Sequence, residues 1–74
     1  MNPSIHIGEK IRKHLAEQKR SVAWLAIQLG CDQSSLRKSL KKYYITTDLL
    51  FRISTLLGKD FFVYYTKLLS DEKT

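Results

Sequence analysis

The chain has 74 residues, and 13 lysines and arginines against 7 aspartates and glutamates give it a formal net charge of +6. This length fits one domain with a small core, and the basic excess favours a polyanion (DNA, RNA or an anionic membrane) as partner. A single cysteine excludes an internal disulfide, and without a signal-peptide pattern or an apolar run of roughly 20 residues a soluble cytoplasmic protein is expected.

The spacing of apolar residues predicts an all-α bundle of five helices in a single domain. The first helix is expected over residues 6–18, with Ile7, Ile11 and Leu15 along its apolar side. The folded core is expected to cover about residues 5–69, and residues 70–74 to form a polar tail. Five helices suit so short a chain because helices need few long loops.

The second helix is expected over residues 22–29, where apolar residues recur at i, i+3, i+4 and i+7. Ser21 precedes it, in the position where a hydroxyl caps the free backbone N–H groups of a helix. Gly30 follows directly and is expected to close the helix with a positive φ. Only Cys31, expected as a small buried residue of the turn, separates this glycine from Asp32, a strong cap for the next helix.

The third helix, residues 33–42, combines a narrow apolar side with a basic outer side. Leu36 and Leu40 form the apolar seam, and Lys38 lies opposite to it at about 100° per residue. A helix held by so short a turn exposes its outer face to solvent or to a partner. That face is polar and basic, and it carries Gln33, Ser34, Arg37, Lys38 and Lys41.

Two further helices complete the prediction. Thr46 is expected to cap the fourth, which ends at Gly58 and buries a stripe of leucine and isoleucine. Asp60 is expected to cap a last helix over residues 61–69. That helix carries two neighbouring apolar stripes, and the second consists of Phe62, Tyr65 and Leu69. Either this stripe packs inside the monomer, or it pairs with a second copy in a homodimer.

The second and third helices together resemble the helix-turn-helix of the lambda-repressor-like, Cro-type family of DNA-binding proteins, often called xenobiotic-response-element regulators. The matching residues are Leu25, Ala26, Gly30 and Leu36. Residues 7–11, IGEKI, are similar to the opening helix of such domains, and residues 46–58, TTDLLFRISTLLG, to the fourth. Two positions depart from the family pattern, because Val22 replaces a frequent glutamine and Ser39 a usual apolar residue.

The resemblance implies sequence-specific binding of double-stranded DNA by a transcriptional regulator, with helix 33–42 in the major groove. Base contacts are expected from Gln33, Ser34, Arg37 and Lys38. Contacts to the DNA backbone are expected from Lys19, Arg20, Ser21, Lys41, Lys42 and Tyr43. Glutamine pairs with adenine and arginine with guanine through two hydrogen bonds each, which makes these residue types suitable for reading bases.

Two other functions stay open. A protein of the same fold can be an antitoxin or phage-type regulator that acts mainly through a protein partner. A helical module that binds only proteins would carry its charge for solubility alone. No enzymatic activity and no cofactor are expected, because His6, His14 and Cys31 make no convincing metal set and no catalytic constellation is recognisable.

Overall fold

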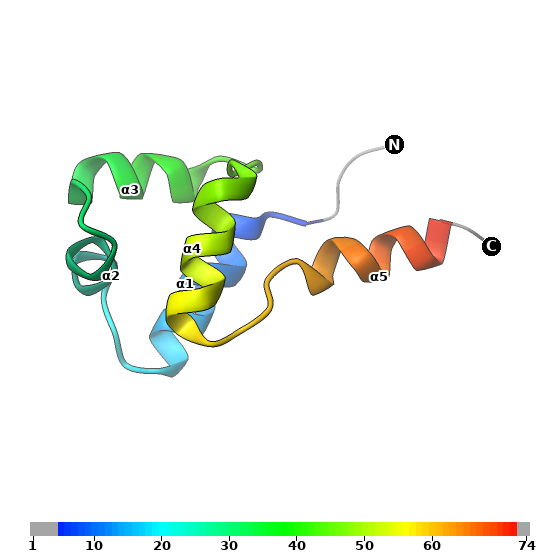
Figure 1. The fold of residues 1–74 in the computed structure, drawn as a ribbon, viewed down its shortest axis with the longest axis horizontal. Helices are drawn as coiled ribbons and strands as arrows, with labels where there is room; N and C mark the ends of the chain where they lie inside the picture. The colour runs from blue at the N-terminus through cyan, green and yellow to red at the C-terminus, as the bar shows by residue number, and fades with distance from the viewer. Residues whose placement is uncertain (1–4, 73–74) are drawn as a thin grey trace.

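The computed structural model describes residues 5–72, and in this part of the chain every regular element is a helix. The all-α prediction is therefore confirmed. The order is α1 (Ile7–Glu17), α2 (Val22–Leu29), α3 (Gln33–Lys41), α4 (Thr47–Leu57) and α5 (Val63–Glu72). Figure 1 shows α3 at one end of the bundle formed by α1–α4 and the α1–α2 turn at the other end, while α5 extends away from the bundle.

Local caps define the ends of the central helices as predicted. Ser21, Asp32 and Thr46 each accept a hydrogen bond from the backbone N–H three residues further on, at 3.0, 3.0 and 3.3 Å. Gly30 and Gly58 end α2 and α4 with φ of 72° and 64°. This left-handed conformation favours glycine because other residues bring their Cβ too close to the backbone.

One cluster of buried side chains joins the helices. The predicted apolar seams of α1 and α3 are buried, and Ala26 of α2 is only 2 % exposed. A small side chain at this position allows α2 and α3 to pack closely. The largest fully buried side chains are Phe61, Ile7, Ile11, Leu15, Leu25, Leu36, Leu40 and Ile53.

Gly8 of α1 packs directly against the backbone of α3 at Leu40. A Cβ on this residue would collide with the carbonyl group of Leu40, since it would stand 2.6 Å from the carbonyl carbon and 2.9 Å from the Cα. Both are backbone atoms, so no side-chain rotation can make room. A glycine in α1 therefore sets the distance between α1 and α3.

The last helix begins later and ends later than predicted, at Val63 and Glu72 rather than at residues 61 and 69. The Asp60 carboxylate accepts the N–H of Phe62 at 2.9 Å, so it caps a turn before the helix. The chain makes this turn while it inserts Phe61 fully into the core. Residues 70–72 of the expected polar tail are thus helical, and residues 73–74 lie outside the described residues.

The expectation for Cys31 was also wrong, because this residue is exposed. Its backbone N–H donates to the carbonyl oxygen of Ala26 at 3.0 Å and completes the end of α2, which leaves the side chain outside. None of the helices in the described part of the chain has the length and apolar character to cross a membrane.

Candidate nucleic-acid interface

The outer face of α3 gathers the side chains that we expected to contact bases. Gln33, Ser34, Arg37 and Lys38 are all exposed. On the opposite side of the helix, Leu36 and Leu40 are 2 % and 1 % exposed. Helix α3 contains no acidic residue, and the carboxylate of Asp32 just before it is used as the cap. The outer face therefore presents only neutral and positive groups.

Gln33 and Arg37 lie one helical turn apart and bind each other. When the Gln33 amide is oriented with its oxygen toward Arg37, Nε and Nη2 of the arginine donate to that oxygen at 3.1 and 2.8 Å. This arrangement holds the guanidinium along the helix. It leaves the NH₂ group of Gln33 and the remaining N–H groups of Arg37 available to a ligand.

His6 anchors the far end of α3, a role that the sequence did not reveal. Its Nδ1 accepts the backbone N–H of Glu9 at 3.2 Å, so Nε2 must carry the hydrogen, and it donates to the carbonyl oxygen of Lys41 at 2.9 Å. The ring of Tyr43 packs on the imidazole, with 4.5 Å between the ring centroids. Tyr43, an expected backbone contact, is thus held in place while 53 % of it stays exposed.

A hollow of about 90 Å³ lies where α1, α2 and α3 meet. It is lined by Arg12, Val22, Arg37, Leu40 and Lys41. Val22 is the first residue of α2, and the first N–H groups of a helix have no partner within the helix. Three cationic side chains beside a helix N-terminus form a suitable environment for an anion such as phosphate. Arg12 was missing from the expected contacts because periodicity does not show which side of α1 lies beside α3.

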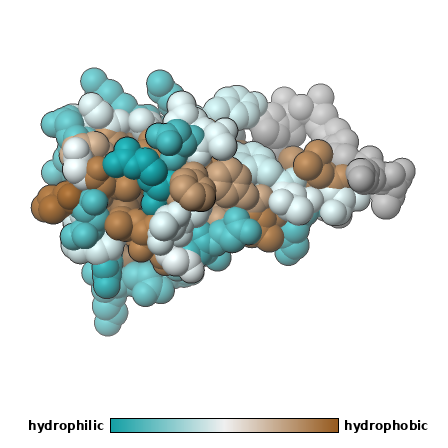
Figure 2. All heavy atoms as spheres, in the orientation of Figure 1, coloured by the Kyte–Doolittle hydropathy of each residue, from teal (hydrophilic) through white to brown (hydrophobic). Residues whose placement is uncertain are grey.

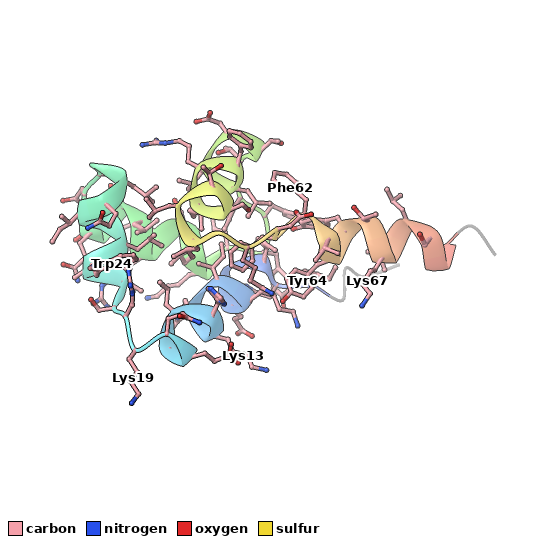
Figure 3. All side chains as sticks on the ribbon, turned by 60° about the horizontal axis from the view of Figure 1, so that its bottom comes forward. Lys13, Lys19, Trp24, Phe62, Tyr64 and Lys67 are labelled. Carbon is pink, nitrogen blue, oxygen red and sulfur yellow. The ribbon has the colours of Figure 1, made fainter. Side chains whose placement is uncertain are left out.

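The other expected backbone contacts lie in the α1–α2 turn and at the end of α3. Ser21 accepts the N–H of Trp24, and its own hydroxyl hydrogen can still be donated. Lys19 has a left-handed backbone with φ of 58° and points away from the bundle (Figure 3). Arg20 lines a different part of the surface, since its guanidinium lies over the Trp24 ring at 4.1 Å from the centroid. Lys42 is exposed at the end of α3.

The chain matches no protein-family model, curated protein or solved structure. Within the described residues, no group of histidine, cysteine, aspartate and glutamate is placed to hold a metal ion.

Several cations away from α3 have packing roles within the protein. Nη2 of Arg52 donates to the carbonyl oxygen of Leu29 at 2.7 Å and fixes the end of α2 against α4. The ammonium groups of Lys10 and Lys59 lie 5.2 and 5.9 Å from the ring centroid of Tyr64. The cations of α3 differ because they project from the outer face of their helix.

Proposed function

We propose that this protein is a lambda-repressor-like transcriptional regulator that binds double-stranded DNA sequence-specifically, with α3 in the major groove. The observation that carries the proposal is the outer face of α3, which is exposed, basic and free of carboxylates. An α-helix with its side chains is about 10–12 Å wide, which matches the width of the major groove. The buried seam of Leu36 and Leu40 gives such a helix a rigid support.

In this proposal, Gln33 and Arg37 read bases as a unit, with Ser34 and Lys38 beside them. The hydrogen bonds between Gln33 and Arg37 orient both groups before DNA arrives. Preorganisation of this kind reduces the entropy that binding costs. The hollow beside Val22 takes a phosphate between Arg12 and Lys41, and Ser21 and Lys42 extend the backbone contacts along the duplex.

Selection from a random duplex library tests the proposal and identifies the site. On the selected site, Arg37→Ala or Gln33→Ala is expected to cost about 1–3 kcal/mol and to relax specificity at one base pair. Because the two side chains bind each other, the double variant should cost less than the sum of the single variants. Fluorescence anisotropy at a fixed salt concentration measures all four proteins. Equal affinity of every variant for all duplexes would contradict the base-reading role.

The phosphate contacts predict a change in salt dependence. Lys41→Ala and Arg12→Ala should each weaken binding to every duplex alike and reduce the log–log salt slope by about one, because each loses one phosphate contact. Lys67→Ala is the matched control, since this exposed lysine lies on α5 and points away from the bundle (Figure 3). A slope that changes equally in the control would mean that only the total charge matters.

A homodimer through Phe62, Tyr65 and Leu69 is part of the proposal. Leu69 is 65 % exposed, and the half-buried Phe62 and Tyr65 border a hollow of about 260 Å³ without a charged residue, completed by Tyr44, Ile45, Thr47 and Leu50. Burial, with a smaller contribution from Tyr44, raises the pKa of the Tyr65 phenol, so this group stays neutral. Figure 2 shows apolar side chains between α4 and α5 on this face. Two copies of a chain with net charge +6 repel each other, so an uncharged face is the surface best suited to a contact between them.

Leu69→Glu should therefore shift the protein from dimer to monomer in sedimentation experiments without changing the fold, because the side chain is mostly exposed. A dimer presents two recognition helices about 34 Å apart, so the same variant should lose its preference for pseudo-palindromic sites. Thr66→Glu, another exposed position on α5, is the control. A wild-type protein that is monomeric both alone and on its selected site would refute the dimer.

A further inference from the structure

A groove lined by both polar and apolar side chains lies at the end of the bundle opposite to α3. This groove, here called the basal groove, has a volume of about 360 Å³ and is lined by His14, Gln18, Arg20, Trp24, Leu56, Leu57 and Gly58. These residues come from the end of α1, the turn that follows it, the start of α2 and the end of α4. The ends of α1 and α4 and the α1–α2 turn lie at the lower edge of Figure 1. None of the expected base contacts lines this groove.

The floor of the basal groove is apolar and partly open. Trp24 and Leu57 are half-buried. Leu56 is 38 % exposed, although the leucines of α4 were expected to form a buried stripe. Figure 3 shows Trp24 on the first turn of α2, above the exposed Lys19 of the turn. Leucine and tryptophan side chains gain stability when a partner removes them from water.

Arg20 supplies a fixed positive group at the rim. Its guanidinium lies 4.1 Å from the centroid of the Trp24 ring, so the indole face holds it in place. A guanidinium held in this way keeps its N–H donors at its edges, where a carboxylate can accept two of them. His14 and the amide of Gln18 add further hydrogen-bonding groups along the same rim.

The charges around the basal groove favour an acidic ligand. The lining contains Arg20 and no carboxylate. Among the residues within two positions of the lining in sequence, two are acidic, Glu17 and Asp60, and four are basic, Arg12, Lys13, Lys19 and Lys59. These positive charges would also attract nucleic acid. The phosphate backbone of a duplex, however, has no apolar side group that could pack on the leucine and tryptophan side chains of the groove.

We propose that the basal groove binds a peptide segment of a partner protein in which an acidic residue accompanies apolar anchors. The carboxylate accepts hydrogen bonds from Arg20, and the apolar side chains pack on Trp24 and Leu56. Because α3 lies at the other end of the bundle (Figure 1), such a peptide can bind while α3 is bound to DNA. The groove would then connect a regulator to a second protein.

Selection from a phage-displayed library of random linear peptides tests this proposal on the full chain. The enriched peptides are expected to combine aspartate or glutamate with leucine, isoleucine or phenylalanine. Binding of a synthetic copy should change the emission of Trp24, which is the only tryptophan of the chain. Arg20→Glu and Leu56→Glu should each weaken binding by about tenfold or more, as expected for the loss of a charge-assisted hydrogen bond or of apolar burial.

Lys67→Glu is the matched control, because it makes the same change of charge as Arg20→Glu on an exposed residue of α5 and should leave peptide affinity unchanged. Leu56→Glu should also keep the duplex affinity of the wild type, which separates this proposal from DNA binding by α3. Recovery of no peptides, or of peptides without acidic residues, would overturn the proposal. Displacement of the peptide by free benzoate at equal concentration would overturn it too, because the groove would then select small carboxylates.

Discussion

Gly8→Ala should destabilise the protein by about 3 kcal/mol or more, although it adds one methyl group to a helix. Helix propensity alone would favour the alanine by up to about 1 kcal/mol. The collision with Leu40 opposes this gain, because the new Cβ would overlap backbone atoms of α3. Relief requires α1 and α3 to separate, which opens the core around Ile7, Ile11 and Leu40. We therefore expect the packing cost to exceed the gain in propensity.

Urea denaturation followed by far-ultraviolet circular dichroism measures this effect. A domain of 74 residues is typically stable by about 4–11 kcal/mol, so the variant should unfold at a much lower urea concentration. Gly58→Ala is the matched control, because its Cβ meets open space and only the φ of 64° opposes it. That control should lose about 1 kcal/mol. Equal losses in the two variants would mean that α1 and α3 can move apart easily.

The contrast between these two glycines illustrates what can be predicted from sequence. Gly58 follows an apolar stripe at the end of a helix, and its positive φ is a local property that a short segment reveals. The reason for Gly8 lies at Leu40, 32 positions further along the chain, in a contact that only the packed helices create. The caps at Ser21, Asp32 and Thr46 were predictable for the same reason as Gly58.

The candidate interface also combines features that one helix predicts with features that depend on the packing of two helices. The exposure of Gln33, Ser34, Arg37 and Lys38 follows from the period of a single helix and was predicted. The hollow needs Arg12 from α1 beside Lys41 from α3, and the support of α3 by His6 crosses between the same two helices. Such pairs depend on the relative rotation of α1 and α3, which apolar spacing leaves undetermined.

The start of α5 was misplaced because a tertiary contact outweighed a local signal. Asp60 has the chemistry of a helix cap, and the apolar run behind it fits helical spacing. In the folded chain, Phe61 is buried in the core and does not start the helix. The first helical hydrogen bonds come after it, where the carbonyl oxygen of Phe62 accepts the N–H groups of Tyr65 and Thr66, both at 3.0 Å. The helix therefore begins only after the phenylalanine that attaches it to the bundle.

Phe61→Ala should also destabilise the protein strongly, with a loss of about 3–5 kcal/mol in the free energy of unfolding. Phe61 is 0 % exposed and is the largest fully buried side chain of the core. The rings of Phe61 and His14 pack edge to face at 84°, with 5.8 Å between their centroids, so removal of the Phe61 ring leaves a cavity beside His14 of α1. Phe51→Ala is the matched control, because this phenylalanine of α4 is 61 % exposed and should cost less than about 1 kcal/mol.

Hydrogen exchange under native conditions should show which helix loses most stability in Phe61→Ala. Phe61 lies two residues before the start of α5, a helix that extends away from the bundle (Figure 1). Amides of residues 65–70 should therefore lose more protection in Phe61→Ala than amides of α2 and α3, because the helix loses the side chain that ties it to the core. Urea curves of Phe61→Ala and Phe51→Ala that superimpose would show that Phe61 does not hold the core together. Unchanged protection of α5 in the presence of a large loss of stability would mean that the helix is held by Tyr64, Tyr65 and Leu68 instead.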